Sequence, residues 1–217
     1  MHETRRYDDP CGIARALDAI GDRWALLIVR ELIFGPKRFL QLRSGLHSVS
    51  PNVLSQRLRD LEDGGVIRRG VLDPPASVAV YELTDRGRAL EPVLLELGRW
   101  GSQEAITTSN EMSPDALLVA LKTAFDPPAA TDGVYALDLE GEWFTVMASA
   151  GSLTVSRGRT TVADVTLRAD VGTMRAVGFA RLPIAEAEDL GRLTVTGDRA
   201  LAERFTRMFP PPRPALP

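Results

Sequence analysis

Five polar side chains in one short segment have the types and the spacing that suit contact with DNA. They are Asn52, Ser55, Gln56, Arg57 and Arg59. Asn and Gln pair well with the edge of adenine and Arg with guanine, while Ser and Arg also reach the phosphate backbone. The segment therefore predicts a DNA-reading surface, with the solvated polar face of an ordinary amphipathic helix as the alternative.

The same segment carries the signals of a helix that could hold these side chains in place. Ser50 is a good N-cap residue, and Pro51 suits the first helical position. A step of about 100° per residue puts Asn52, Gln56 and Arg59 opposite the apolar side, with Ser55 and Arg57 on the flanks. That apolar side is formed by Leu54, Leu58 and Leu61. Gly64-Gly65 is expected to stop the helix.

The flanking segments complete a winged helix-turn-helix pattern. Apolar residues recur at helical spacing from Ile13 to Leu32, and Gly35-Pro36 breaks the run. A second short helix begins near Phe39, and the turn SGLHSV joins it to the helix at Ser50. Two strands, VIRRGVL and SVAVYEL, then form a wing around the turn DPPA. A helix from Thr84 or Asp85 follows, in which Pro92 either makes a kink or marks the first turn.

Positive charge is concentrated around this pattern. The net charge of the whole chain is −3, but residues 37–69 hold seven Lys and Arg against three acidic residues. A local surplus of this kind is expected where a segment meets phosphates, although it also arises by chance. Arg38, Arg68 and Arg69 therefore join the candidate DNA contacts, together with the helix cap Ser50.

The second half of the chain has a different rhythm. We expect a winged helix-turn-helix domain over residues 1–106, a polar linker over 107–113, a mixed helix and strand domain over 114–209 and a Pro-rich tail over 210–217. The linker reads TTSNEMS, and Ser113-Pro114 starts a helix. Short strands follow, for example GVYALDLE and EWFTVMAS. The predicted fold class is α+β.

The first half resembles a known family. The segments GDRWALLIVRELIFGPKRF, LSQRLRDLEDGGVIRR and YELTDRGRAL are similar to the HxlR family of winged-helix transcriptional regulators, which are relatives of the MarR group. The resemblance covers residues 11–102. It implies a homodimer on a pseudo-palindromic operator, with the helix at Ser50 in the major groove. The wing tip DPPASV departs from the pattern because it carries no Lys or Arg, so wing contacts are expected to be weak or limited to Arg68 and Arg69.

The second half resembles another family on shorter motifs. The segments ADVTLRAD, LGRLTVTGD and ALAERFTRMF look like the domain of sterol carrier protein type two. That likeness implies a five-stranded, mostly antiparallel sheet, covering helices and an apolar tunnel for a lipid-like ligand. The candidate wall residues are Leu117, Leu121, Phe125, Trp143, Met147, Met174, Val177, Phe179, Leu182, Phe205 and Phe209. The alternative is that these side chains fill a closed core.

Two hypotheses fit Cys11, the single cysteine of the chain. It precedes the first helix and lies one turn from Arg15, and a helix N-terminus favours the reactive thiolate. Some proteins of the HxlR family sense oxidants or electrophiles through a cysteine in this region. The other reading is a half-buried cysteine that acts as a small apolar residue, since the chain has no second cysteine to resolve an oxidised one.

Other chemistry has little support. His2 and His47 lie far apart without a cysteine at metal spacing, so we expect no metal site, and no cofactor is implied. Nothing pairs a Ser, Asp or Glu with a catalytic His, which argues against an enzyme. No apolar run reaches membrane-spanning length and MHETRRYDDPCG lacks a signal-peptide core, which predicts a cytoplasmic protein. The expected function is a dimeric regulator controlled by an apolar effector. The alternatives are a regulator whose second domain is only a scaffold and a thiol-sensing regulator.

Overall fold

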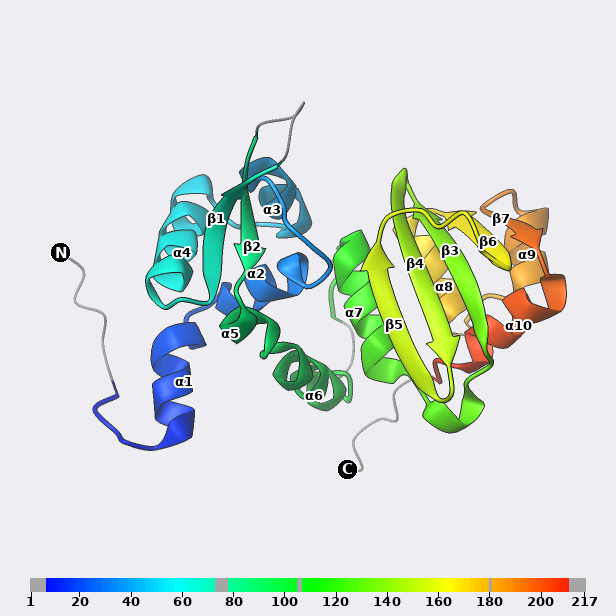
Figure 1. The fold of residues 1–217 in the computed structure, drawn as a ribbon. Helices are drawn as coiled ribbons and strands as arrows, with labels where there is room; N and C mark the ends of the chain where they lie inside the picture. Colours follow the sequence, from blue (N-terminus) through cyan, green and yellow to red (C-terminus); the bar gives the residue numbers. More distant parts are fainter. Residues whose placement is uncertain (1–6, 73–77, 105–106, 180, 211–217) are drawn as a thin grey trace. The chain divides into compact units, whose positions relative to one another are not determined.

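The computed structural model describes residues 7–72, 78–104, 107–179 and 181–210 (Figure 1). The chain divides into two compact units, Met1–Leu94 and Leu95–Pro217. Within the described residues, no helix is long and apolar enough to cross a membrane.

The first unit is a set of helices with a two-stranded sheet. Its elements are α1 (Gly12–Ile20), α2 (Ala25–Leu32), α3 (Phe39–Gly45), α4 (Pro51–Asp63), β1 (Ile67–Val71), β2 (Ala79–Leu83) and α5 (Asp85–Arg88). The helix α6 (Glu91–Gly101) begins at the end of this unit. The sequence predicts three helices, a wing and one helix, whereas four helices precede the wing in the structure and two, α5 and α6, follow it.

The apolar run from Ile13 to Leu32 is divided into two helices. Helix α1 ends at Gly21, and Trp24 has a left-handed backbone (φ 82°) directly before α2 begins. A non-glycine residue in this region disfavours a continuous helix, so α2 starts in a new direction. Pro92 lies in the first turn of α6, which settles the choice between a kink and a helix start.

The core of the first unit forms where the helices α1, α2, α3 and α4 meet the wing. Leu54, Leu58 and Leu61 of α4 are at most 1% exposed, and they belong to one apolar cluster with Ile28 of α2 and Ile67 of β1. Burial of a leucine side chain contributes about 1.5–3 kcal/mol. This buried stripe fixes which face of α4 is turned outward.

The wing is anchored to the helices by a buried lysine. Strands β1 and β2 are antiparallel and lie side by side, and Lys37 forms a bridge with Tyr81 on the other side of β2 (Figure 1). Lys37 Nζ donates to Glu31 Oε2 at 2.8 Å, and both side chains are buried. Glu31 Oε1 also accepts from Arg30 Nη2 at 2.8 Å, so the buried carboxylate is shared between two cations.

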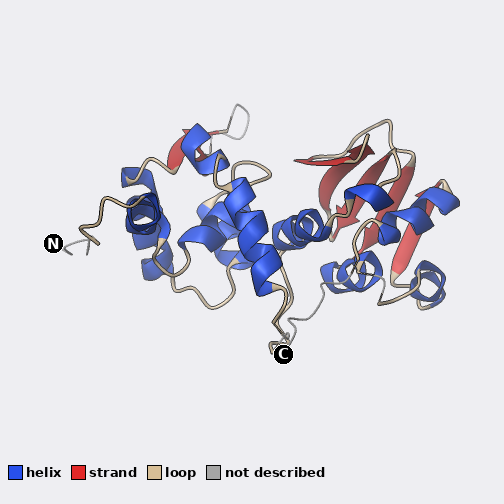
Figure 2. Ribbon diagram, turned by 90° about the horizontal axis from the view of Figure 1, so that it is seen from below, coloured by secondary structure: helices blue, strands red, loops and turns tan. Residues whose placement is uncertain are grey.

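The second unit contains a sheet and helices. Its strands are β3 (Gly133–Leu139), β4 (Glu142–Ser149), β5 (Ser152–Arg157), β6 (Val165–Ala169) and β7 (Leu193–Gly197). Its helices are α7 (Pro114–Ala124), η1 (Pro127–Ala129), α8 (Val171–Gly178), α9 (Ile184–Asp189) and α10 (Arg199–Arg207). The strands form one curved layer in Figure 2. The α+β fold class is confirmed.

The sheet has the order β5-β4-β3-β6-β7. All neighbouring strands are antiparallel except β3 and β6, which are parallel. Alternate residues point to opposite faces of a strand, so Tyr135 and Leu137 share the helix-covered face with their neighbour Phe144. Helix α8 lies behind the strands in Figure 1. The other face carries a row of residues in register across β4, β3, β6 and β7. They are Thr145, Ala136, Thr166 and Thr196, in that order.

Aromatic rings fill the space between α10 and the sheet. The Phe205 ring lies 4.8 Å from that of Tyr135 and 5.0 Å from that of Phe209, measured between centroids. All three side chains are fully buried. Contacts of this geometry contribute about 0.5–1.5 kcal/mol beyond the area they bury.

A buried ion pair joins α7 to the edge strand β5. Arg157 Nη2 donates to Asp115 Oδ1 at 2.5 Å, and the Asp115 side chain is completely buried. Arg157 also pairs with Glu142 and lies 4.7 Å from the Phe144 ring centroid. Burial lowers the pKa of Arg157, but the hydrogen bonds and charges of Asp115 and Glu142 outweigh burial and raise it. The guanidinium therefore stays charged and holds α7 in place.

Candidate nucleic-acid interface

Both ends of α4 are defined by local sequence. Ser50 caps the helix, because its side chain accepts a hydrogen bond from Val53 N at 3.3 Å. At the other end Gly65 is left-handed (φ 66°), and the amides of Gly65 and Val66 donate to Glu62 O and Leu61 O, both at 2.9 Å. This pair of bonds is a Schellman motif, which glycine permits. The predicted start and stop of the helix are therefore confirmed.

The outward face of α4 presents the three residues predicted to read bases. Asn52 and Arg59 are exposed, and Gln56 is half-buried. Arg59 Nη2 donates to Gln56 Oε1 at 2.8 Å, and Gln56 Nε2 donates to Asp60 Oδ1 at 2.7 Å. The chain of bonds holds the Gln56 amide in one orientation, with its oxygen toward Arg59. Ser55 is half-buried on the flank.

Arg57 differs from the other candidates because its guanidinium is held within the protein. Its Nη1 contacts Asp22 Oδ2, and it also donates to Asp60 Oδ2 at 2.8 Å. Only 24% of the side chain is exposed. A phosphate would have to compete with two carboxylates for this group, so the geometry favours a role in anchoring α4 to the turn between α1 and α2.

The two wing arginines are exposed but paired with acidic residues. Arg68 Nε donates to Glu82 Oε1 at 2.8 Å across the strand pair, and Arg69 Nε lies 3.2 Å from Glu62 Oε2. The Arg69 guanidinium also lies 5.7 Å from the Tyr81 ring centroid. Surface pairs of this kind are weak, about 0–1 kcal/mol, so a phosphate could replace the carboxylate. The wing tip, residues 73–77, lies outside the described residues.

Helix α3 carries Arg43, an arginine that was not among the predicted DNA contacts. Arg38 and Arg43 are exposed, at the start of α3 and within it. Neither forms an ion pair in the described part of the chain. Arg43 contributes to the local charge surplus, and the structure shows that its side chain is exposed. Lys37, counted in the same surplus, is buried with Glu31 and cannot contact DNA.

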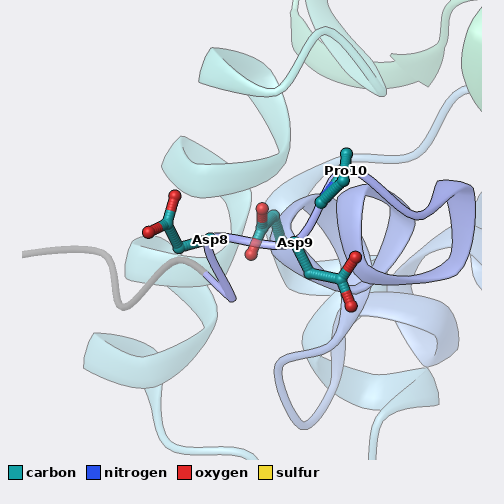
Figure 3. Close-up of a pocket in the computed structure, with 4 residues that line it drawn as sticks. Asp8, Asp9 and Pro10 are labelled. Carbon is teal, nitrogen blue, oxygen red and sulfur yellow. The ribbon is translucent and has the colours of Figure 1, made fainter.

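A separate hollow of about 360 Å³ lies beside α1, where Asp8, Asp9, Pro10 and Asp18 line it (Figure 3). Asp18 Oδ1 accepts a hydrogen bond from Tyr7 N, and Asp9 Oδ1 accepts one from Cys11 N. The concentration of carboxylates repels phosphates. Among the residues described, no group of three or more His, Cys, Asp and Glu is placed to hold a metal ion. The hollow is therefore no rival to α4 as the interface.

The comparison with known proteins agrees with this geometry. Residues 19–109 match the HxlR-like helix-turn-helix family. YvaP of Bacillus subtilis (strain 168), an uncharacterized HTH-type transcriptional regulator, is 39% identical over 89 residues, which cover 41% of this chain and 82% of YvaP. The chain belongs to the HxlR-like helix-turn-helix family.

Other comparisons extend the relation and identify the second half. YodB, an HTH-type transcriptional regulator of the same bacterium, is 35% identical over 88 residues, 41% of this chain and 79% of YodB. The crystal structure of quinone-bound YodB from B. subtilis matches 42% of this chain and 97% of the YodB chain. The sequence identity is 33% and the TM-score is 0.37. Residues 120–210 match the SCP-2 sterol transfer family, so the regulator carries an SCP-2 domain after its HxlR-like domain.

Most candidate wall residues of the SCP-2 domain lie on its helix-covered side. Fully buried positions are Leu117, Leu121, Met174, Val177, Phe205 and Phe209. Half-buried positions are Phe125, Phe179 and Leu182. Phe125 contacts the same aromatic group, with its ring centroid 6.3 Å from that of Phe209. Burial raises the pKa of the nearby Tyr135 to about 12, which reflects how little water reaches this layer.

Two predicted wall residues lie on the wrong face of the sheet. Trp143 and Met147 alternate along β4 with the buried Phe144 and Val146, so their side chains point away from the helices. Met147 is 45% exposed. Size alone suggested both residues as wall residues, but the strand period places them on the opposite face, so we remove both from the candidate pocket.

Cys11 lies at the N-cap of α1, and its side chain is exposed. The position agrees with the expected place before the first helix. The exposure disagrees with the reading of a half-buried apolar residue, since a thiol at the surface packs against little. An accessible thiol at a helix start is the geometry that a sensing role needs.

Proposed function

We propose that the chain acts as a homodimer on a pseudo-palindromic DNA operator, with α4 of each subunit in the major groove. The observation that carries the proposal is the division of α4 into two faces. One face is a fully buried leucine stripe, and the other presents Asn52, Gln56 and Arg59 to solvent. An exposed helix with amide and guanidinium groups suits the donor and acceptor pattern of the major groove.

The remaining candidates divide by the contact they would make. Asn52, Gln56 and Arg59 would read base edges, and the Gln56–Arg59 bond would present the two side chains as one unit. Ser50, Ser55, Arg38 and Arg43 would contact phosphates, which sets register without sequence information. Arg68 and Arg69 would exchange their carboxylate partners for phosphates of the wing contact. Arg57 would act indirectly by positioning α4.

We further propose that the chain works as the four segments inferred from its sequence. Residues 1–106 would bind DNA and dimerise, 107–113 would link, 114–209 would bind an apolar effector, and 210–217 would form a tail. Support for the effector comes from the SCP-2 match and from the many buried apolar side chains on the helix-covered side of the sheet. The place of action would be the cytoplasm.

An effector can change DNA binding only if it binds the two DNA-related states unequally. A typical coupling of about 1–3 kcal/mol would change DNA affinity by roughly 5–150-fold. If the second domain is a scaffold, DNA binding would be indifferent to fatty acids and sterols. This alternative is tested by the same titrations.

The decisive experiment for DNA binding is selection of bound duplexes from a random pool, alongside fragments of genomic DNA. The proposal expects one enriched motif with two related half-sites about one helical turn apart. An Asn52→Ala, Arg59→Ala double variant, selected in parallel, should enrich no such motif. Equal enrichment by the two proteins would contradict the proposed reading face.

A second candidate function is thiol sensing, which the exposure of Cys11 favours. Alkylation with N-ethylmaleimide would then change the affinity for the selected operator, and Cys11→Ser would abolish that response. An unchanged affinity after complete alkylation, verified by mass spectrometry, would remove this candidate and leave the effector proposal untouched.

A further inference from the structure

A small hollow lies on the face of the C-terminal sheet that the helices of its own unit leave uncovered, away from the apolar layer. Its volume is about 150 Å³, and its walls come from β4, β6, β7 and the loop after β5. The lining residues are Trp143, Arg159, Thr166, Arg168, Thr194 and Thr196. Sites for drug-sized ligands measure about 300–1,000 Å³, so this hollow suits a small ion or one end group of a larger molecule.

Two guanidinium groups contact the indole of Trp143. The Cζ atom of Arg159 lies 4.5 Å from the ring centroid, and that of Arg168 lies 5.7 Å from it. A guanidinium over the face of an aromatic ring keeps its charge and its N–H donors. The tryptophan therefore holds two cations at the rim without neutralising them.

The balance of charge around the hollow is positive. Asp138 is the acid nearest in register to these residues, and Arg168 Nε donates to its Oδ2 at 2.7 Å. The other carboxylate oxygen of Asp138, Oδ1, accepts a hydrogen bond from Gly141 N at 2.9 Å. Arg159 is exposed, and no acidic residue forms an ion pair with it in the described part of the chain.

The three threonine hydroxyls that line the hollow can donate to a ligand, and Thr194 and Thr196 are exposed. Thr166, Thr194 and Thr196 belong to neighbouring strands, with Thr166 opposite Thr196 and Thr194 opposite Arg168. Among the described residues, none of the three hydroxyls donates a side-chain hydrogen bond. A ligand with several acceptor oxygens would satisfy these hydroxyls and the Arg159 guanidinium together.

We propose that this hollow binds an oxyanion, either a carboxylate or a phosphate group. Arg159 would supply the charge, the three threonines would supply hydrogen bonds, and Trp143 would hold the two arginines in position. The site is independent of the α4 interface and of the apolar pocket. Its test therefore does not depend on the proposed DNA binding.

The test is a titration of the full-length protein followed by NMR at the Trp143 indole N–H. The chain has three tryptophans, and the signal of Trp143 is the one lost in Trp143→Phe. Sodium phosphate and sodium acetate are added in separate series at constant ionic strength, with chloride as the balancing ion. We expect the indole signal to shift saturably in at least one series, and the responding series identifies the oxyanion.

Arg159→Gln and Arg207→Gln provide the matched comparison. Both arginines are exposed, but Arg207 belongs to α10 and does not line the hollow. Arg159→Gln should bind roughly tenfold more weakly or worse, as loss of a charge-assisted hydrogen bond does, and Arg207→Gln should bind as the natural chain does. Shifts that stay linear in both series, or saturation that Arg159→Gln leaves unchanged, would overturn the proposal.

Discussion

The guanidinium group of Arg57 contacts the carboxylate of Asp22, which lies between α1 and α2 and 35 residues earlier in the chain. The same guanidinium also bonds to Asp60 one turn further along α4. The outward face of α4 is therefore held by an ion pair as well as by its buried leucines. This pair links a flanking residue of α4 to the turn between α1 and α2.

The first prediction concerns that link. Arg57→Ala should lower the free energy of unfolding by about 1 kcal/mol or less, since the pair is partly exposed. DNA affinity should fall more for the specific duplex than for the scrambled one, because the base contacts of α4 depend on its position. Urea denaturation and binding titrations measure the two effects. An equal loss on both duplexes, without a loss of stability, would show instead that Arg57 contacts a phosphate.

The second prediction is a stable homodimer formed through α6. Val93, Leu97 and Trp100 lie at helical spacing on this helix and are 46–69% exposed. An exposed apolar face of this kind favours a partner, and a C₂ dimer would bury it on both subunits. Light scattering at micromolar concentration should give twice the mass of the chain.

Leu97→Asp should convert that dimer to a monomer, because it places a charge in the apolar contact. Val162→Asp is the control, since Val162 is an exposed apolar residue of the second unit outside α6. It should remain dimeric. A natural chain that is monomeric at this concentration would contradict the dimer and leave palindromic binding without an explanation.

The third prediction concerns stability at high pH. Burial raises the pKa of Tyr135 to about 12, above the usual 10.0. Its contribution to stability is therefore fully present below pH 10 and is lost as the pH rises through about 12. The loss amounts to roughly 2–3 kcal/mol, from about 1.4 kcal/mol per pKa unit.

Tyr135→Phe should reduce this alkaline loss. The substitution removes only a long hydrogen bond, from the hydroxyl to Thr131 O at 3.4 Å. At pH 8 its stability should therefore be within about 1 kcal/mol of the natural chain. Urea denaturation from pH 8 to pH 11.5 compares the two proteins. Parallel curves would mean that Tyr135 ionises as easily in the folded state as in the unfolded one.

The fourth prediction concerns an apolar effector. A fatty acid or sterol that binds the second domain should raise the melting temperature, with a stabilisation of about 2.7 kcal/mol at a concentration 100 times its Kd. Native mass spectrometry of protein purified from cells should also detect a bound apolar molecule. Phe179→Trp adds bulk at a half-buried wall position and should weaken the stabilisation.

Phe205→Ala is the companion variant for the core. Phe205 is fully buried between Tyr135 and Phe209, so its loss should cost about 3–5 kcal/mol with or without ligand. Lipid binding by the natural chain decides whether the second domain binds an effector or is a scaffold. A domain that binds none of the lipids, and in which both variants only lower stability, is a scaffold.

Local signals in the sequence predicted much of the fold. Ser50 and Gly64-Gly65 predicted the ends of α4, and its leucine spacing predicted the outward face, because caps and periodicity act over a few residues. The strands of the second unit were predicted in the same way. The division of the first helical run at Trp24 was not predicted, since its left-handed backbone leaves the apolar spacing unchanged.

Longer-range contacts were beyond the sequence. The pairs Arg157–Asp115 and Arg57–Asp22 join residues 42 and 35 positions apart, and no spacing rule connects them. Trp143 was assigned to the apolar pocket from its size alone. Its actual neighbours, Arg159 and Arg168, depend on the sheet order and on which face it occupies.

The measurement that tests the central proposal most directly is the ratio of affinities for the selected operator and a scrambled duplex, determined for Arg59→Ala and Arg43→Ala at two salt concentrations. Arg59→Ala should lower the affinity for the operator by about 1–3 kcal/mol and change scrambled binding little, so the ratio falls. Arg43→Ala should weaken both by the same factor and reduce the salt dependence, as loss of a phosphate contact does. An Arg59→Ala ratio equal to that of the natural chain would contradict the assignment of α4 as the helix that reads DNA.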